Sequence, residues 1–156
     1  MGHPDVEREW LTVFLDDLRA AESAAAEVLA AWIAVCRLEG LRGGLRAIAE
    51  REAAHAELIA ERLREIGAPC AAAVAEAVRA AALARFGSGA VSDEEKIAHL
   101  LARYPDDESA TRPLRAVLDR LDHDLETREI LRLVADGEAA TIAWLRAYST
   151  GLARTA

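Results

Sequence analysis

The chain has 156 residues, of which 53% are hydrophobic, 29% charged and only 4% aromatic. That length fits one domain with a real core, and the composition is typical of an all-helical protein. A net charge of −8 argues against nucleic acid and anionic membranes as partners. The first residues show no export signal, and no apolar run is long enough to span a membrane, so we expect a cytoplasmic protein.

The two cysteines, Cys36 and Cys70, form neither a disulfide framework nor a C-x-x-C pair. We expect reduced, partly buried thiols, as is usual for a cytosolic protein.

A long first helix is expected from about Asp5 to about Leu38, with Pro4 suited to its start. Apolar residues at steps of three and four define a core-facing seam along it. The seam consists of Leu11, Leu15, Leu18, Glu22, Ala25, Leu29, Trp32 and Cys36. Glu22 is its one charged member.

A turn is predicted at Glu39–Gly44, where three glycines occur, and a second helix runs from there to the stop at Gly67–Pro69. Its seam contains Leu41, Leu45, Ile48, Glu52, His55, Ile59 and Leu63. A short connection makes two long helices antiparallel neighbours, so residues 5–68 should form a hairpin. Glu22 and Glu52 can approach the same level of that hairpin. Glu50, Glu57 and Glu61 lie off the seam and should be solvated.

Residues 70–107 are predicted to form a crossover of two shorter helices. The first is CAAAVAEAVRAAALARF, and the second begins after a Gly-Ser-Gly break at a Ser92-x-x-Glu95 capping box. His99 has Lys96 three residues before it, where a bundle metal motif has glutamate. A surface or half-buried histidine is therefore expected.

The last part, 108–149, should form a second hairpin. Its first helix has Leu114, Leu118 and Leu121 inward and ends near Asp122–Asp124. The final helix has the seam Leu131, Val134, Glu138, Thr141, Leu145 and Tyr148. EAAH at 52–55 corresponds to EAAT at 138–141, and Glu-Ser-Ala occurs thirty residues upstream of each, at 22 and 108. This spacing indicates an internal duplication of a helical hairpin.

Charged residues in a core seam need a physical explanation, because burying an ionised carboxylate is costly unless it is paired or metal-bound. Glu and His at positions i and i+3 on an inward helix face is the pattern of di-iron bundles. Glu22, Glu52 and His55 are therefore candidate metal ligands, with a buried hydrogen-bonded cluster as the alternative.

The chain resembles the ferritin-like superfamily of di-iron carboxylate bundles in its helical segments. EAAHAELIAERLREIGAP is similar to the second bundle helix of bacterioferritins and rubrerythrins, and HDLETREILRLVADGEAATIAWL to the fourth helix of bacterioferritins. ESAAAEVLAAWIAVCRLEG resembles the first rubrerythrin helix. The resemblance implies an all-α, ferritin-like four-helix bundle with a long helical crossover between helices two and three.

The resemblance also implies roles for individual residues. Glu52 and Glu138 would be bridging carboxylates, while Glu22 and His55 would be terminal ligands of the first iron. By repeat symmetry Glu108 would be the third-helix glutamate, although Pro105 and Pro113 on either side disturb its helical phase. The implied cofactor is iron, one or two ions, with manganese as an alternative.

Three departures from the family pattern change these expectations. Thr141 stands where the second motif histidine belongs, which removes a nitrogen ligand from the second metal. Ala53 stands where bacterioferritin has its haem-ligating methionine, so no haem is expected. No fifth helix is visible, which argues against a storage shell and favours a small homo-oligomer, most plausibly a dimer.

Three interpretations remain open at this stage. The first is a di-iron or mixed-metal oxidase or ferroxidase that acts on Fe(II), oxygen or peroxide. The second is a carboxylate-rich site for a single metal, with Thr141 and water in place of the lost half. The third is a metal-free ferritin-like bundle that works as a structural or partner-binding module.

Overall fold

The computed structural model describes residues 4–155. Within them the chain forms six α-helices and no strand: α1 (Pro4–Val35), α2 (Glu39–Glu65), α3 (Glu76–Phe86), α4 (Asp93–Leu101), α5 (Arg112–Leu118) and α6 (Leu125–Thr155). The predicted all-α class is confirmed. None of these helices is both long and apolar enough to cross a membrane.

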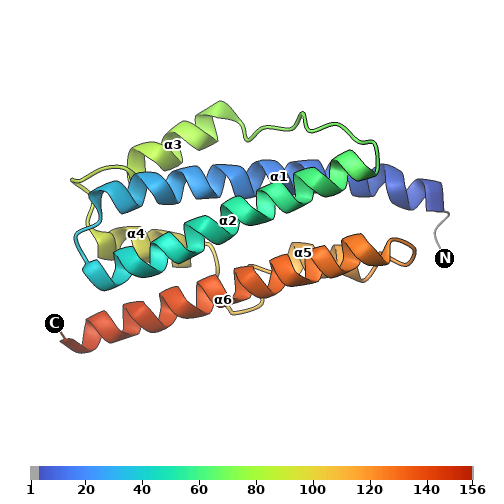
Figure 1. The fold of residues 1–156 in the computed structure, drawn as a ribbon. Coiled ribbons are helices and arrows are strands. Elements are labelled where there is room, and N and C mark those ends of the chain that lie inside the picture. The colour runs from blue at the N-terminus through green and yellow to red at the C-terminus, as the bar shows by residue number, and fades with distance from the viewer. Residues whose placement is uncertain (1–3, 156) are drawn as a thin grey trace.

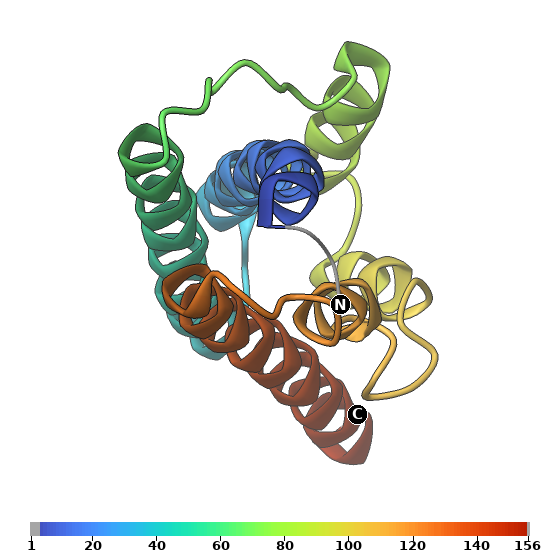
Figure 2. The ribbon, with the colours of Figure 1, turned by 90° about the vertical axis from the view of Figure 1, so that its right-hand side faces the viewer.

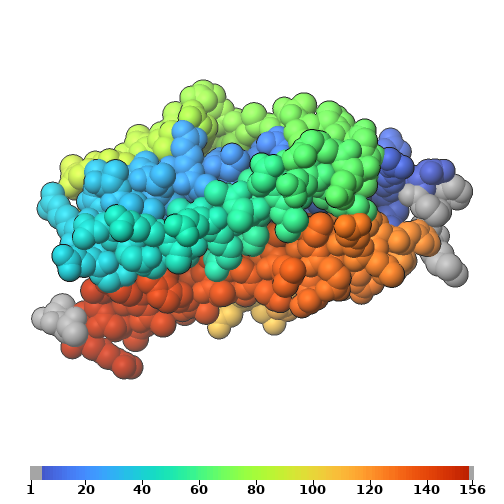
Figure 3. Space-filling model, in the orientation of Figure 1, coloured from blue at the N-terminus to red at the C-terminus, as the bar shows by residue number. Residues whose placement is uncertain are grey.

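The long helices α1, α2 and α6 form three sides of a bundle (Figure 1). α1 and α2 are antiparallel and in extensive contact, and α6 runs along α2, as the space-filling view also shows (Figure 3). Viewed along the helices, α4 and α5 lie one behind the other on the remaining side, where both contact α6 (Figure 2). The connection that contains α3 passes along the outside of α1. The fourth side of the bundle is therefore formed by two short helices instead of one long helix.

The connection between α1 and α2 is shorter than predicted and lies at Cys36–Leu38. The glycines that predicted a turn are inside α2, where two of them, Gly40 and Gly44, allow close packing with α6. A Cβ on Gly44 would lie 2.1 Å from the Trp144 ring, and one on Gly40 would lie 3.2 Å from the Tyr148 hydroxyl. Gly40 and Gly44 therefore serve helix packing rather than chain reversal.

Residues 70–75, predicted as part of a helix, are not helical, and α3 begins only at Glu76. The Asp16 carboxylate on α1 accepts hydrogen bonds from the backbone N–H groups of Ala71 and Ala72, at 2.8 and 2.7 Å. These tertiary bonds hold the segment extended against its helical propensity. The Ser92–Glu95 capping box is confirmed, with hydrogen bonds of 3.1 and 2.9 Å.

The segment from 102 to 111 separates α4 from α5 and consists of turns and bends. α5 has only seven residues; Leu114 is buried, and Leu118 only partly. At the next turn the Glu7 carboxylate accepts the backbone N–H groups of Asp122, His123 and Asp124, at 2.9 to 3.1 Å. Glu7 thus holds the entry to α6, which begins close to its predicted position.

The core consists of two apolar clusters separated along the bundle axis. One contains Leu11, Leu15, Ile59, Leu63, Leu131 and Val134. The other contains Leu29, Trp32, Leu41, Leu45, Ile48 and Leu145. On α1, α2 and α6 alike, the predicted polar seam residues fall between the two clusters, which leaves a polar layer in the middle of the bundle.

Candidate metal centre

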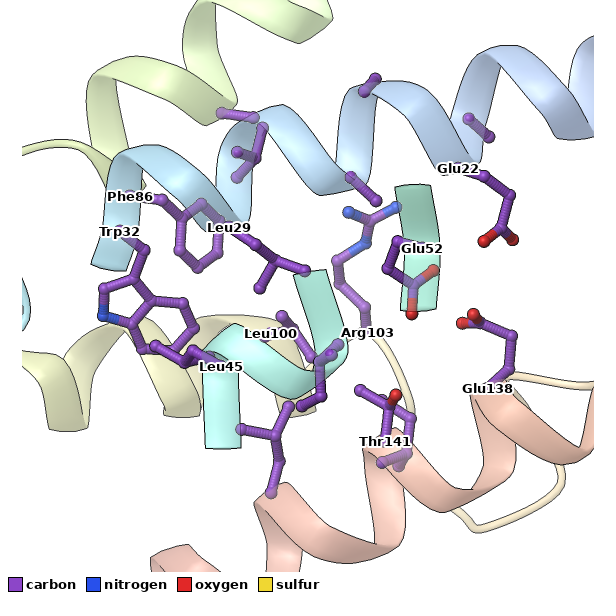
Figure 4. A pocket seen from close by; sticks show the side chains of 18 of the residues that line it. Glu22, Leu29, Trp32, Leu45, Glu52, Phe86, Leu100, Arg103, Glu138 and Thr141 are labelled. Atoms are coloured by element: carbon purple, nitrogen blue, oxygen red, sulfur yellow. The ribbon is translucent and has the colours of Figure 1, made fainter. Parts of the chain in front are cut away.

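The polar layer contains four of the five predicted site residues. α1 contributes Glu22, α2 contributes Glu52 and His55 one turn apart, and α6 contributes Glu138. Each residue offers one possible ligand atom, a carboxylate oxygen or a ring nitrogen, and these four atoms all lie within 4.8 Å of one another. Figure 4 shows the three carboxylates pointing toward a common space. Helical periodicity places these side chains inward, and the antiparallel register of the helices brings them to one level.

The four side chains are withdrawn from solvent. Glu22 and Glu52 are each 5% exposed, and His55 and Glu138 are partly buried. His55 Nδ1 lies 3.1 Å from Glu22 Oε2, and Arg51 Nη2 lies 3.5 Å from Glu52 Oε1. Three acids therefore share a confined space with one imidazole and one guanidinium.

Burial raises the pKa of each of the three carboxyls to about 7. Mutual repulsion adds to this effect, because Glu138 raises the pKa of Glu22, Glu22 that of Glu52, and Glu52 that of Glu138. The Arg51 guanidinium offsets only part of it. Burial also lowers the pKa of His55, although the surrounding acids favour its protonation. The cluster thus disfavours charge on all four groups in the absence of an added cation.

Three buried acids elsewhere in the bundle have lowered instead of raised pKa values. Burial alone would raise the pKa of Glu7, Asp16 and Asp93, but hydrogen bonds from backbone N–H groups outweigh it and bring each pKa below its usual range. Asp93, for example, accepts from Arg37 N and Leu38 N and from the Trp32 indole, at 2.9, 3.3 and 2.8 Å. These acids are satisfied structural groups, whereas the acids of the polar layer interact only with one another, with His55 and with Arg51 among the described residues.

The polar layer has the properties of a cation-binding site. Glu138 Oε1 is buried and has no hydrogen-bond partner among the described residues. Buried polar atoms in folded proteins are nearly always paired, so an orphan oxygen aimed into an acidic cluster indicates a missing partner. Carboxylates with one imidazole suit iron, manganese and zinc. Glu22, Glu52, His55 and Glu138 could all bind such an ion.

Arg51 is the one residue of the layer that the sequence analysis missed. Its guanidinium donates to the hydroxyl of Thr141, which in turn donates to the backbone carbonyl of Gly137 at 3.2 Å. Arg51 therefore contacts the residue that stands where the second motif histidine was expected. Gly137 makes room for this, because a Cβ there would lie 2.9 Å from His55 Cε1 and 3.2 Å from Arg51 Nε. The only sequence signal was a cation next to a seam glutamate, which is common on helix surfaces.

Glu108 lies apart from the other predicted ligands. It is exposed, in the turns between α4 and α5, where its backbone N–H donates to Asp106. The break between α4 and α5 therefore leaves this side of the bundle without a carboxylate at the polar layer. His99 is exposed with its ring edge-on to Phe86, and Glu50, Glu57 and Glu61 are exposed, as predicted.

No protein-family model, curated protein or solved structure matches this chain. Its class therefore rests on its own fold and site. The chain is an all-helical bundle with a buried carboxylate–histidine cluster that could bind a metal ion.

Proposed function

We propose that the protein is a ferritin-like metal-binding protein and that its polar layer is the centre of an iron or mixed-metal oxidase or ferroxidase. The observation that carries this proposal is the convergence of Glu22, Glu52, His55 and Glu138 in a buried layer, where Glu138 Oε1 has no hydrogen-bond partner in the part of the chain that the structure describes. A divalent cation would neutralise the buried acids and fill the position facing Glu138 Oε1.

The ferritin-like topology is part of the proposal. It is supported by the course of the chain, in which α2 is followed by an outer connection that returns along α1 before α4 and α5 begin (Figure 1). α4 and α5 then run in the same direction as α2, and α6 returns antiparallel to them. A bundle with one long crossover has this course.

The side chains favour one strong metal position. Glu22, Glu52, His55 and Glu138 supply its ligands, while Arg51, bonded to Thr141, brings a positive charge where a second ion would bind. A guanidinium keeps its charge at any physiological pH, so a second metal requires Arg51 to move away. Bound iron would supply Fe(II)/Fe(III) redox chemistry toward oxygen or peroxide, with Fe(II) itself as a candidate substrate.

Assembly and location are proposals as well. We expect a small oligomer, most plausibly a dimer, in the cytoplasm. Exposed apolar side chains on the outer faces of α1, α2 and α6, among them Val13, Leu58 and Leu133, offer surface for such a contact. Light scattering should give twice the chain mass, and a twenty-four-subunit shell would favour iron storage instead.

A metal-free structural or partner-binding bundle is the alternative function. One observation favours it: Arg51 already places a cation beside Glu52 without any metal. The two functions differ in whether the remaining negative charge of the layer attracts an ion.

The test compares Fe(II) binding and oxygen consumption by wild type and by His55→Ala, under anaerobic loading followed by addition of air. Loss of the imidazole should weaken Fe(II) binding by at least tenfold and slow oxygen consumption. Glu57→Gln changes an exposed acid on the same helix and serves as the control. Negligible iron uptake by wild type and His55→Ala alike would exclude the metal site and leave the structural bundle.

A further inference from the structure

A cavity of about 390 Å³ lies against the polar layer on the side of the bundle where α3 and α4 pack. α1, α2, α3 and α6 form its walls, together with the end of α4 and the residues that follow it. Glu22, Glu52 and Glu138 border it at one end, and Trp32 and Phe86 at the other (Figure 4). The space connects the candidate metal centre directly with the apolar half of the bundle.

The cavity follows from two features of the sequence. Because α4 ends at Leu101 and α5 starts only at Arg112, no helix supplies core side chains over that length. The facing helices line the cavity there with small side chains, including Ala24 and Ala25 on α1 and Ala82 on α3. Well-packed cores rarely leave such spaces, and binding pockets typically measure 300–1,000 Å³.

The wall is mostly apolar and partly aromatic. Trp32 and Phe86 pack with ring centroids 5.3 Å apart, and Leu29, Leu45 and Leu100 continue the surface toward the carboxylates. At roughly 30 Å³ for each non-hydrogen atom, the volume suits a ligand of about a dozen such atoms. Exposed rim residues, among them Ala21 and Val78, leave the cavity open to solvent.

Two arginines line the same cavity, and they differ in their partners. Arg79 is engaged by Glu27 and Glu76. Arg103 is exposed and has no ion-pair partner among the described residues. Figure 4 places it between the aromatic end and the carboxylates. A free guanidinium at an apolar cavity suits a carboxylate or a similar anionic group.

From these features we infer that the cavity binds a small amphipathic carboxylic acid. The apolar body of the ligand lies against Trp32 and Phe86, and its anionic group pairs with Arg103 beside the polar layer. A role of this ligand as substrate rests on the proposed metal function, whereas its binding does not. The inference therefore adds an organic molecule as the occupant of the cavity beside the candidate metal centre.

The experiment measures binding of decanoate and of decan-1-ol to the purified protein by isothermal titration calorimetry. Decanoate has twelve non-hydrogen atoms and fits the volume. Arg103→Ala should weaken decanoate binding about tenfold and leave decan-1-ol binding unchanged, because only the carboxylate uses the guanidinium. Ala82→Phe should weaken both by at least tenfold by filling the space. Ala80→Phe, on the exposed face of the same helix, should change neither.

A second variant tests the cavity without depending on whether Ala82→Phe folds. Val78 is 62% exposed at the rim, so Val78→Trp should narrow the entrance without disturbing the core. It too should weaken both ligands. Equal affinity of wild type, Ala82→Phe and Val78→Trp for decanoate, or no binding by wild type, would overturn the inference.

Mn(II) titration of the same preparations separates this inference from the proposed function. Decanoate binding without Mn(II) binding would refute the metal centre and retain the ligand cavity. Mn(II) binding without decanoate binding would refute the ligand cavity and retain the metal centre.

Discussion

The buried carboxyls of the polar layer should lower the free energy of unfolding of the metal-free protein as the pH rises. Comparing wild type with Glu52→Gln should measure the contribution of Glu52. Burial raises the pKa of Glu52 from 4.5 to about 7, with Glu22 as the next cause. A carboxyl with a raised pKa in the folded state favours folding while it is protonated. That contribution is present below pH 4.5 and is lost as the pH rises to about 7. Glutamine is neutral throughout, so the variant lacks this loss.

The expected size follows from the same shift. Between pH 5.5 and pH 6.5 the folded carboxyl stays largely protonated while the unfolded one is ionised, and one pH unit in that range is worth about 1.4 kcal/mol; the slope then falls off around pH 7. The free energy of unfolding of Glu52→Gln, relative to wild type, should therefore rise by about 2 kcal/mol between pH 5.5 and pH 8.

Urea denaturation with a chelator present, at pH 5.5 and pH 8, measures the difference. Glu50→Gln, an exposed acid on the same helix, should give a difference that does not change with pH. A pH-independent difference for Glu52→Gln as well would show that the buried acids are satisfied within the fold, and the reasoning from a donor-poor cluster would be refuted.

The other predictions concern the side of the site formed by α6. Thr141→His should displace the Arg51 guanidinium and raise bound iron above the wild-type ratio, as measured by elemental analysis. Unchanged iron with a lower melting temperature would mean that the second position is closed. Gly137→Ala should cost about 1–3 kcal/mol and weaken metal binding, because its Cβ would lie 2.9 Å from His55 Cε1. Gly151→Ala, where the added Cβ meets nothing, should keep or slightly raise thermal stability and should bind metal normally.

The helices and the candidate ligands on them could be predicted because both follow from local periodicity. Glu22, Glu52, His55 and Glu138 each interrupt an apolar seam, and a seam position predicts an inward side chain. The hairpin of α1 and α2 then determines which residues meet at one level. The structure brings Glu22, Glu52 and His55 together as that reasoning expected, and it places Glu138 of α6 beside them, a position that the resemblance and not the hairpin had implied.

Features that depend on tertiary contacts could not be predicted in the same way. The alanine-rich start of the crossover has high helical propensity, yet Asp16 holds its backbone extended. Gly40 and Gly44 suggested a turn, but aromatic rings of α6 more than ninety residues away explain them. In both places a distant side chain overrides the local preference.

The same limit applies to two parts of the site. Glu108 followed from repeat symmetry, which assumes that the second hairpin keeps an unbroken first helix, but the chain turns between α4 and α5. Arg51 could not be identified from spacing, because its long side chain reaches Thr141 on another helix. The broken helix and the arginine together distinguish this site from a symmetric pair of metal positions.

The most direct test of the account is the metal content of the protein after expression in medium supplemented with iron and manganese. Elemental analysis of wild type should give close to one transition-metal ion per chain, with the ratio falling toward zero in Glu52→Gln and staying at the wild-type value in Glu50→Gln. A wild-type protein without bound metal, which also failed to bind Fe(II) or Mn(II) when titrated anaerobically, would contradict the central claim that the polar layer is a metal centre.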